Sequence, residues 1–208
     1  MLLHEAGDAK PIDLTTALKA PPAAGPAAAW HWALEGSRHV TYRDAIGGVH
    51  EFLELKGKWF YADIGARTGA PAAAADPLGY APADHEHVVY LGVDGHIHEI
   101  CFDAVDWRHH DLTAIAEAPA ASGRPSGAYV GGRHCIVYRG VDGNAHFLRL
   151  RLDWRHFALA GLGVIASDPH LSSSGGEGAI THLSVHGQRR WARFTTDPTT
   201  TRIADMPV

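Results

Sequence analysis

A pattern of tyrosine, glycine, histidine and tryptophan recurs at a fixed interval and constrains the fold more than any other feature of the chain. Tyr42, Tyr90 and Tyr138 are each 48 residues apart, and a glycine follows each of them five residues later. A histidine follows eight residues after each tyrosine, and a tryptophan eight or nine residues after that histidine. Because repeats of roughly 20 to 50 residues are typical of solenoids, propellers and arrays, we expect each copy to fold as one supersecondary unit.

The chain divides into half a repeat followed by four whole ones. The half repeat spans 1–21, where Leu3-His4-Glu5 matches Ile97-His98-Glu99. The whole repeats span 22–71, 72–119, 120–166 and 167–208, and the last is degenerate, with His182 in place of the tyrosine. We expect residues 1–208 to form a single domain, a length that suffices for one buried core.

Each whole repeat has the pattern of four short antiparallel strands. In the clearest copy the expected strands are 79–83, 87–91, 96–102 and 107–113. Asp94-Gly95 favours a tight hairpin turn, and the β-branched and aromatic runs around it are too short for helices. Three tight turns and one long return are typical of a propeller blade. The sequence therefore predicts an all-β fold, a β-propeller of about five blade positions built from four-stranded repeats of 48 residues.

Charge and hydropathy argue against several classes of function. Lys and Arg total 18 against 23 Asp and Glu, so the formal charge is −5, whereas a nucleic-acid-binding protein needs a basic face. The apolar stretches are too short and too interrupted to span a bilayer. The first residues lack the pattern of a signal peptide, and localisation stays open. Cys101 and Cys135 belong to no metal-like spacing, and we expect them to be buried in strands.

The 16 histidines raise the question of a metal, because imidazole with nearby carboxylates ligates zinc and copper. His4, His50, His98 and His146 occupy the same place in four of the five copies, which favours a hydrogen bond that the blades share. We expect His98 to pair with Asp111 and His50 with Asp63. No HExxH motif is present, so we predict neither a metal ligand nor a cofactor.

Glu51 and Glu99 follow the repeated histidine, so strand alternation points them to the opposite face of the sheet, toward a gap between blades or toward solvent. Trp59, Trp107 and Trp154 favour either packing between blades or a platform for a ligand. Trp30 and Trp32 lie outside the repeat pattern.

The string HVVYLGVDGHIHE at 87–99, continued by WRHHDLT at 107–113, resembles the repeats of β-propeller lectins. The fucose-binding lectins are the most similar group, with tachylectin and tectonin propellers more distant. In that family a sugar binds between neighbouring blades, held by an arginine and a glutamate and covered by aromatic rings. The resemblance assigns the glutamate to Glu51 and Glu99. Its arginine is expected two residues before the tyrosine, where this chain has Val40, Val88 and Ile136.

The resemblance implies a non-enzymatic, multivalent carbohydrate-binding propeller with shallow sites between blades and glycans or glycoconjugates as partners. The candidate ligand-binding residues are Glu51, Glu99, Arg43, Arg139, Trp59, Trp107, Trp154 and Tyr90. A protein-interaction or assembly scaffold is the alternative, and a propeller glycosidase or lyase is a third hypothesis. The half repeat either completes a ring within the chain or pairs with a second copy as a homo-oligomer.

Overall fold

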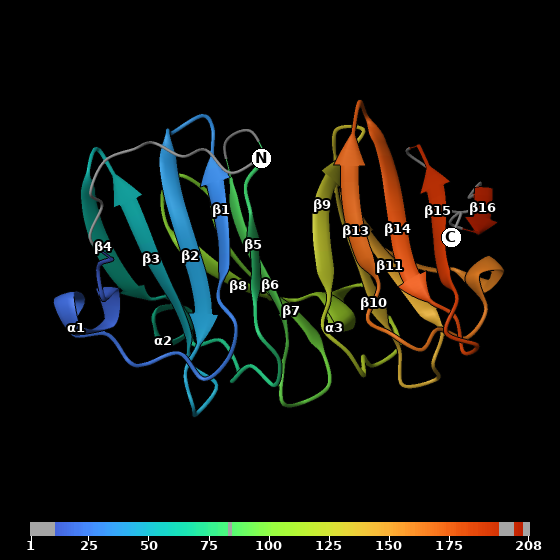
Figure 1. The fold of residues 1–208 in the computed structure, drawn as a ribbon, viewed down its shortest axis with the longest axis horizontal. Helices are drawn as coiled ribbons and strands as arrows, with labels where there is room; N and C mark the ends of the chain where they lie inside the picture. Colours follow the sequence, from blue (N-terminus) through green and yellow to red (C-terminus); the bar gives the residue numbers. More distant parts are fainter. Residues whose placement is uncertain (1–10, 83–84, 196–201, 206–208) are drawn as a thin grey trace.

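The computed structural model describes residues 11–82, 85–195 and 202–205, and these form four antiparallel sheets of four strands each (Figure 1). Blade 1 comprises β1 (Ala28–Trp32), β2 (Ser37–Arg43), β3 (Val49–Leu55) and β4 (Lys58–Asp63). Blade 2 comprises β5 (Leu78–Tyr80), β6 (Glu86–Leu91), β7 (Ile97–Phe102) and β8 (Trp107–Asp111). Blade 3 comprises β9 (Ser126–Val130), β10 (Arg133–Arg139), β11 (Ala145–Leu150) and β12 (Trp154–Ala158). Blade 4 comprises β13 (His170–Ser174), β14 (Glu177–Leu183), β15 (Arg189–Phe194) and β16 (Arg202–Asp205).

The strands of each blade pair in sequence order, and the first strands of successive blades lie against one another. β1 packs on β5, β5 on β9, and β9 on β13. In Figure 1 the blades follow one another from blade 1 at one end to blade 4 at the other. The prediction of an all-β propeller is confirmed. The predicted count of five blade positions is not confirmed, because the described residues form four blades.

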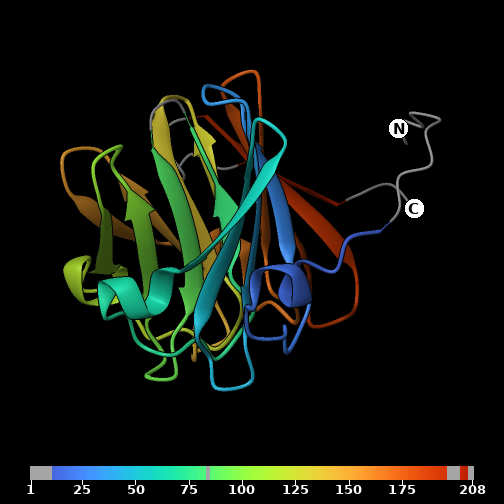
Figure 2. The same cartoon turned by 90° about the vertical axis from the view of Figure 1, so that its left-hand side faces the viewer.

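Short helices follow the fourth strands of blades 1 and 2, and a similar helix precedes blade 1; Figure 2 shows α1, α2 and α3 at the same end of the molecule. Their bounds are α1 (Leu14–Leu18), α2 (Ile64–Thr68) and α3 (Leu112–Ile115), with a 3₁₀ turn, η1 (Ala160–Leu162), after blade 3. Each α-helix begins after an aspartate (Asp13, Asp63 or Asp111) whose carboxylate accepts a backbone N–H of the first turn. None of these helices, which have three to five residues, could cross a membrane, and the described residues contain no other helix that could.

These aspartate caps correct one strand boundary. The strand predicted at 107–113 ends at Asp111, because the capping carboxylate starts a helix at Leu112. The Thr113 hydroxyl then accepts the backbone N–H of Ile97 at 2.8 Å. α1 contacts β4 as α2 contacts β8, so the segment before blade 1 resembles the end of a repeat. Residues 1–10 of the predicted half repeat, including His4 and Glu5, lie outside the described residues.

The repeated tyrosine ties each of the first three blades to the connection that precedes it. The hydroxyls of Tyr42, Tyr90 and Tyr138 donate to the carbonyls of Pro21, Pro71 and Pro119 at 2.9, 3.0 and 2.8 Å. All three rings are buried. The tyrosine column is thus explained by a bond that the blades share.

The apolar core lies between blades rather than in one central cluster. Ile64 of blade 1's connection packs with Val88 and Ile100 of blade 2. Equivalent clusters join blade 2 to blade 3 and blade 3 to blade 4. Cys101 and Cys135 are free and buried in strands β7 and β10, as expected. Each blade therefore depends on its neighbour for the burial of one face.

The repeated histidine is structural in its contacts, but its partner differs from the predicted one. His98 Nε2 lies 3.0 Å from Asp94 in the hairpin turn, and His50 and His146 have the corresponding contacts with Asp44 and Asp142 at 3.2 and 3.0 Å. The predicted pairing of His98 with Asp111 is wrong, because that carboxylate caps α3 and bonds His96 instead. Asp63 likewise caps α2, with its carboxylate 3.8 Å from His50 Nδ1.

Replacement of Tyr90 by phenylalanine tests the contribution of the tyrosine–proline bond. We expect Tyr90→Phe to lower the free energy of unfolding by about 1–2 kcal/mol, because the bond is lost and the Pro71 carbonyl keeps no donor. Urea denaturation measures the change. Tyr129→Phe, on a ring that is 40% exposed, is the matched control and should stay within about 0.5 kcal/mol of the unchanged protein. Equal losses in the two variants would contradict a specific role for the bond.

Candidate functional site

A pocket of about 190 Å³ lies between blades 1 and 2 and is lined by acidic and aromatic side chains; we call it site I. Its polar lining comes from Glu35, His39 and Glu51 of blade 1 and from Glu86 of blade 2. Its aromatic lining includes Trp32 and Phe60 of blade 1 and Phe102 and Trp107 of blade 2. Three carboxylates and one imidazole thus share a small space with five large rings, of which Tyr61 of blade 1 is the fifth.

Strand alternation and register bring the polar groups of site I together. His39 on β2 pairs in register with Leu53, two residues from Glu51 on β3, so the two side chains are diagonal neighbours on one face. His39 Nδ1 lies 2.7 Å from Glu51 Oε1. Glu86 begins β6 of the next blade, and its Oε1 lies 3.8 Å from the same nitrogen. Two blades therefore place carboxylates beside the same nitrogen of one imidazole.

The electrostatics of site I are dominated by an excess of acid. Burial, together with a hydrogen bond to Glu51 and the nearby charges of Glu51 and Glu35, raises the pKa of Glu86 to about 11. Without another cation, the Glu86 carboxyl holds a proton at neutral pH. His39 has its other nitrogen, Nε2, 2.7 Å from the hydroxyl of Ser37. Trp30 stacks on the His39 ring, with centroids 4.0 Å apart.

The equivalent gap between blades 2 and 3, which we call site II, has the opposite balance of charge. Glu99 lies 2.8 Å from His87 Nδ1 and 3.2 Å from His110 Nδ1, and His134 of blade 3 packs on His87. Burial alone would raise the pKa of Glu99, but the hydrogen bonds from His110 and His87 outweigh it and lower this pKa to about 2. One carboxylate among three imidazoles stays ionised, in contrast to the acid excess of site I.

The gap between blades 3 and 4 is apolar at the corresponding positions. Phe147 occupies the column of Glu51 and Glu99, and its ring meets Phe194 edge-on at 5.1 Å. Cys135 takes the place of His39 and His87, and it belongs to the same buried cluster. The glutamate and histidine of the first two gaps are therefore replaced by core residues in the third.

The two predicted arginines join elements of the fold instead of lining site I. Arg43 lies 2.9 Å from Asp76, and Arg139 lies 3.6 Å from Asp168. Each aspartate belongs to the connection that leads to the next blade, so each pair ties the end of a second strand to that connection. Tyr90, also predicted as a ligand contact, is fully buried with its hydroxyl on Pro71.

The tryptophan column separates into different environments. Trp107 lines site I, whereas Trp154 is buried in the cluster between blades 2 and 3. Trp59 is half-buried on β4 and pairs in register with Glu54. Of the predicted residues, site I brings together Glu51 and Trp107, and Glu99 belongs to site II.

Sequence reasoning did not assign several residues of site I, among them His39, Trp32 and Glu86. His39 and its counterpart His87 stand three residues before the tyrosine, a recurrence that could have indicated a pair with the glutamate. Trp32 stood out only as lying outside the pattern. Glu86 occupies a position where blade 1 has Arg38 and blade 3 has His134, so the repeat carries no signal for it.

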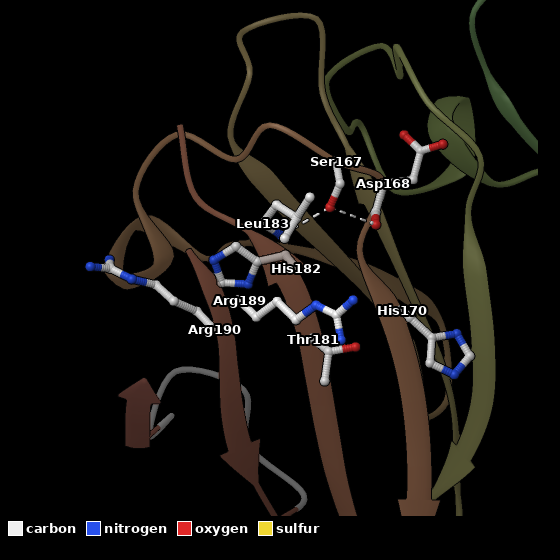
Figure 3. A pocket seen from close by; sticks show the side chains of 8 residues that line it. All are labelled: Ser167, Asp168, His170, Thr181, His182, Leu183, Arg189 and Arg190. Atoms are coloured by element: carbon white, nitrogen blue, oxygen red, sulfur yellow. Dashed lines mark hydrogen bonds between the residues drawn. The ribbon is translucent and has the colours of Figure 1, made fainter. Parts of the chain in front are cut away.

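A larger pocket, of about 310 Å³, lies in blade 4 (Figure 3). His182 and Arg189 from β14 and β15 contribute basic groups, along with His170 and Arg190. The Ser167 hydroxyl accepts the backbone N–H of Leu183 at 2.9 Å, as Figure 3 shows. Among the residues that the structure describes, no tryptophan, tyrosine or phenylalanine lines this pocket, so it lacks the large aromatic surface that covers the apolar face of a sugar.

Three groups of described side chains bring potential metal-ligating atoms within 4.8 Å of one another. They are His39, Glu51 and Glu86; Glu99, Cys101 and His110; and Asp94, His96 and Asp111. The first group is buried throughout and belongs to site I.

The fold is similar to that of solved lectins. The Aleuria aurantia lectin N224Q mutant, solved with α-methyl-L-fucoside, has a TM-score of 0.61 and 14% identity over 88% of this chain and 60% of that one. The SapL1 lectin, solved with α-methyl fucoside, has a TM-score of 0.63 and 14% identity over 87% of this chain and 63% of that one. One structure of the Aleuria aurantia lectin is described as a six-bladed β-propeller.

An enzyme has a related architecture as well. An α-L-arabinofuranosidase from Clostridium thermocellum has a TM-score of 0.55 and 11% identity over 86% of this chain and 71% of that one. Comparisons with models of known protein families and with curated protein sequences give no match. The resemblance to lectin propellers is thus confirmed in the fold, and the chain spans about 60% of the length of the Aleuria aurantia lectin.

Replacement of Glu99 by glutamine tests the electrostatics of site II through pH. The pKa of Glu99 is lowered from 4.5 to about 2, so its stabilising effect is present above pH 4.5 and is lost as the pH falls toward 2. We expect Glu99→Gln to lower the free energy of unfolding at pH 7 by about 1.5–3 kcal/mol, the range for hydrogen bonds to a charged group. The difference from the unchanged protein should shrink below pH 4.5.

Urea denaturation at several pH values between 7 and 3 measures this difference. Glu177→Gln, on an exposed carboxylate of β14, is the control and should give a small difference at every pH. A Glu99→Gln penalty that does not change with pH would contradict the ionised state of Glu99.

Proposed function

We propose that the protein is a non-enzymatic carbohydrate-binding propeller and that site I receives a terminal sugar. The observation that carries the proposal is a pocket between two blades in which carboxylates and large aromatic rings line the same space. Carboxylates accept charge-assisted hydrogen bonds from sugar hydroxyls, and indole or phenyl rings cover the apolar C–H face. The similarity of the fold to lectins solved with fucosides supports the same class of ligand.

Within site I we assign the polar contacts to Glu51 and His39 and the stacking surface to Phe60 and Trp107. Phe60 is 50% exposed, which is unusual for a ring of this size and leaves its face free for a ligand. The pocket is smaller than the roughly 300–1,000 Å³ typical of drug-sized ligands, which suits one sugar ring better than a long oligosaccharide.

The contacts of this chain differ from those of the fucose-binding repeats. The arginine of that pattern has no counterpart at Val40 or Val88, and Arg43 is paired with Asp76. Instead, the imidazoles of His39 and His87 are the groups that bond the glutamates. We therefore propose a monosaccharide recognised through carboxylate and imidazole groups, without assigning it as fucose.

Glycoside hydrolysis is a second candidate, favoured by the two carboxylates of Glu51 and Glu86 and by the arabinofuranosidase with a related fold. Their oxygens approach within 4.8 Å of each other. Retaining glycosidases hold their carboxyl groups about 5–5.5 Å apart, on either side of the scissile bond, and inverting ones hold them further apart. The close contact in site I leaves little room for a glycosidic bond, and we propose binding instead.

A glycan array with the purified protein tests the proposal. We expect binding to a defined terminal sugar, weakened about 2- to 12-fold in Phe60→Ala because a stacking contact of about 0.5–1.5 kcal/mol is lost. Glu51→Gln removes a charge-assisted hydrogen bond and should weaken binding by about 10- to 100-fold. Titration calorimetry with the sugar that binds measures both effects.

Ile46→Ala is the matched control, since this side chain is 85% exposed in the turn between β2 and β3 and does not line site I. It should bind as the unchanged protein does. If no glycan on the array binds, the result would favour the hypothesis of a protein-interaction scaffold. If the protein releases sugar from a bound glycan, the result would favour the hypothesis of an enzyme.

A further inference from the structure

His39, Glu51 and Glu86 form a cluster at the junction of blades 1 and 2 that is buried from solvent. Their exposed fractions are 1%, 2% and 3%. Each offers a nitrogen or oxygen atom within 4.8 Å of the other two. Two of the residues come from adjacent strands of blade 1 and the third from the first residue of β6 in blade 2, so the cluster exists only when the blades are packed together.

The cluster contains two carboxyl groups and only one imidazole to neutralise them. Glu51 accepts a hydrogen bond from His39, but Glu86 Oε1 is buried and accepts no hydrogen bond from a described residue, and the polar neighbour of the Glu86 carboxyl is another carboxylate, that of Glu51. The His39 nitrogen that could serve it is 3.8 Å away and is already 2.7 Å from Glu51. A buried carboxylate is costly unless it is paired, protonated or bound to a metal.

We propose that His39 Nδ1, one oxygen of Glu51 and one oxygen of Glu86 bind a divalent transition-metal ion of the Zn²⁺ class. Imidazole nitrogen and carboxylate oxygen are both zinc ligands, and three protein ligands with one open position are typical of zinc sites that also take an exogenous ligand. Two charges on the ion balance the two carboxylates. All three residues line site I, so the open position faces the pocket.

The surroundings of His39 support this role. Its Nε2 is bonded to the Ser37 hydroxyl at 2.7 Å, and Ser37 is fully buried. Trp30 stacks on the ring with an interplanar angle of 14°. Metal-binding histidines have their second nitrogen fixed by such a partner, which orients the ligating nitrogen. Here the partner directs Nδ1 toward both carboxylates.

The other two groups of ligand atoms are already satisfied. Glu99 has two imidazole partners, and burial raises the pKa of the adjacent Cys101 thiol to about 12, so the sulfur stays protonated. Asp111 bonds His96 and caps α3, while Asp94 bonds His98. In neither group does a carboxylate oxygen stand buried without a partner, as in Glu86.

Zinc binding measured without a sugar tests the inference independently of the proposed function. The full-length protein is stripped with a chelator, dialysed, and titrated with ZnCl₂ by calorimetry, and its thermal unfolding is recorded with and without the metal. We expect one site that is tighter than any binding to surface histidines. We also expect a rise in Tm with zinc concentration, because the ion binds only the folded state.

Glu86→Gln is the decisive variant, because it keeps the shape of the side chain and removes one ligand charge. The variant should stay folded without metal, since it also removes the unpaired carboxyl. Loss of a partner that merely orients a ligand costs roughly 10- to 100-fold in affinity, so loss of a ligand should weaken zinc binding by at least about 100-fold. The zinc-dependent rise in Tm should vanish as well, and His39→Gln should have the same effect.

Glu99→Gln is the matched control in site II and should bind zinc as the unchanged protein does. The inference is overturned if the unchanged protein binds no zinc, or if Glu86→Gln binds it equally, since the ion would then sit on other histidines. A glycan array repeated with a chelator separates the two proposals. If the protein binds a sugar but no zinc, the proposed function stands and the metal site is overturned. If it binds zinc but no sugar, the metal site stands and the proposed function is overturned.

Discussion

The burial of each blade's apolar face against the next blade is the interaction on which the rest of the structure depends. The clusters around Ile64, Leu112 and Phe147 all join residues of consecutive blades. A four-stranded sheet of this size has two faces and little core of its own, so it is stable only within the row. The tyrosine–proline bonds and the arginine–aspartate pairs strengthen the same junctions at their edges.

Polar sites arise where this apolar contact is interrupted. At the first junction the interruption is acidic, with Glu51 and Glu86 around His39; at the second it is rich in imidazole, with His87 and His110 around Glu99. At the third junction Phe147 restores the apolar contact. The blades thus keep one scaffold while the chemistry between them changes, because the positions that face the gap are not needed for the strand pairing itself.

The sequence was sufficient to predict the fold, since period, turn residues and strand composition all depend on contacts within one repeat. The sequence was less informative about hydrogen-bond partners where a side chain has more than one possible partner. Asp111 was expected to bond His98, but it caps a helix instead, because the local backbone geometry places it at the start of α3. Glu51 and Trp107 could be proposed from their columns. Glu86 could not be proposed, because the contacts that it makes depend on which blade precedes it. The number of blade positions could not be predicted either, because the repeat length does not depend on the angle between blades.

The residue four positions before the tyrosine has a broader consequence. It is Glu86 in blade 2 and His134 in blade 3, and in each case it faces the glutamate site of the preceding blade. The charge and polar residues of a gap therefore depend on the pair of blades that flank it and not on either blade alone. Shuffling the order of otherwise unaltered repeats, as unequal recombination does in duplicated genes, would combine old surfaces into recognition sites that neither parent had.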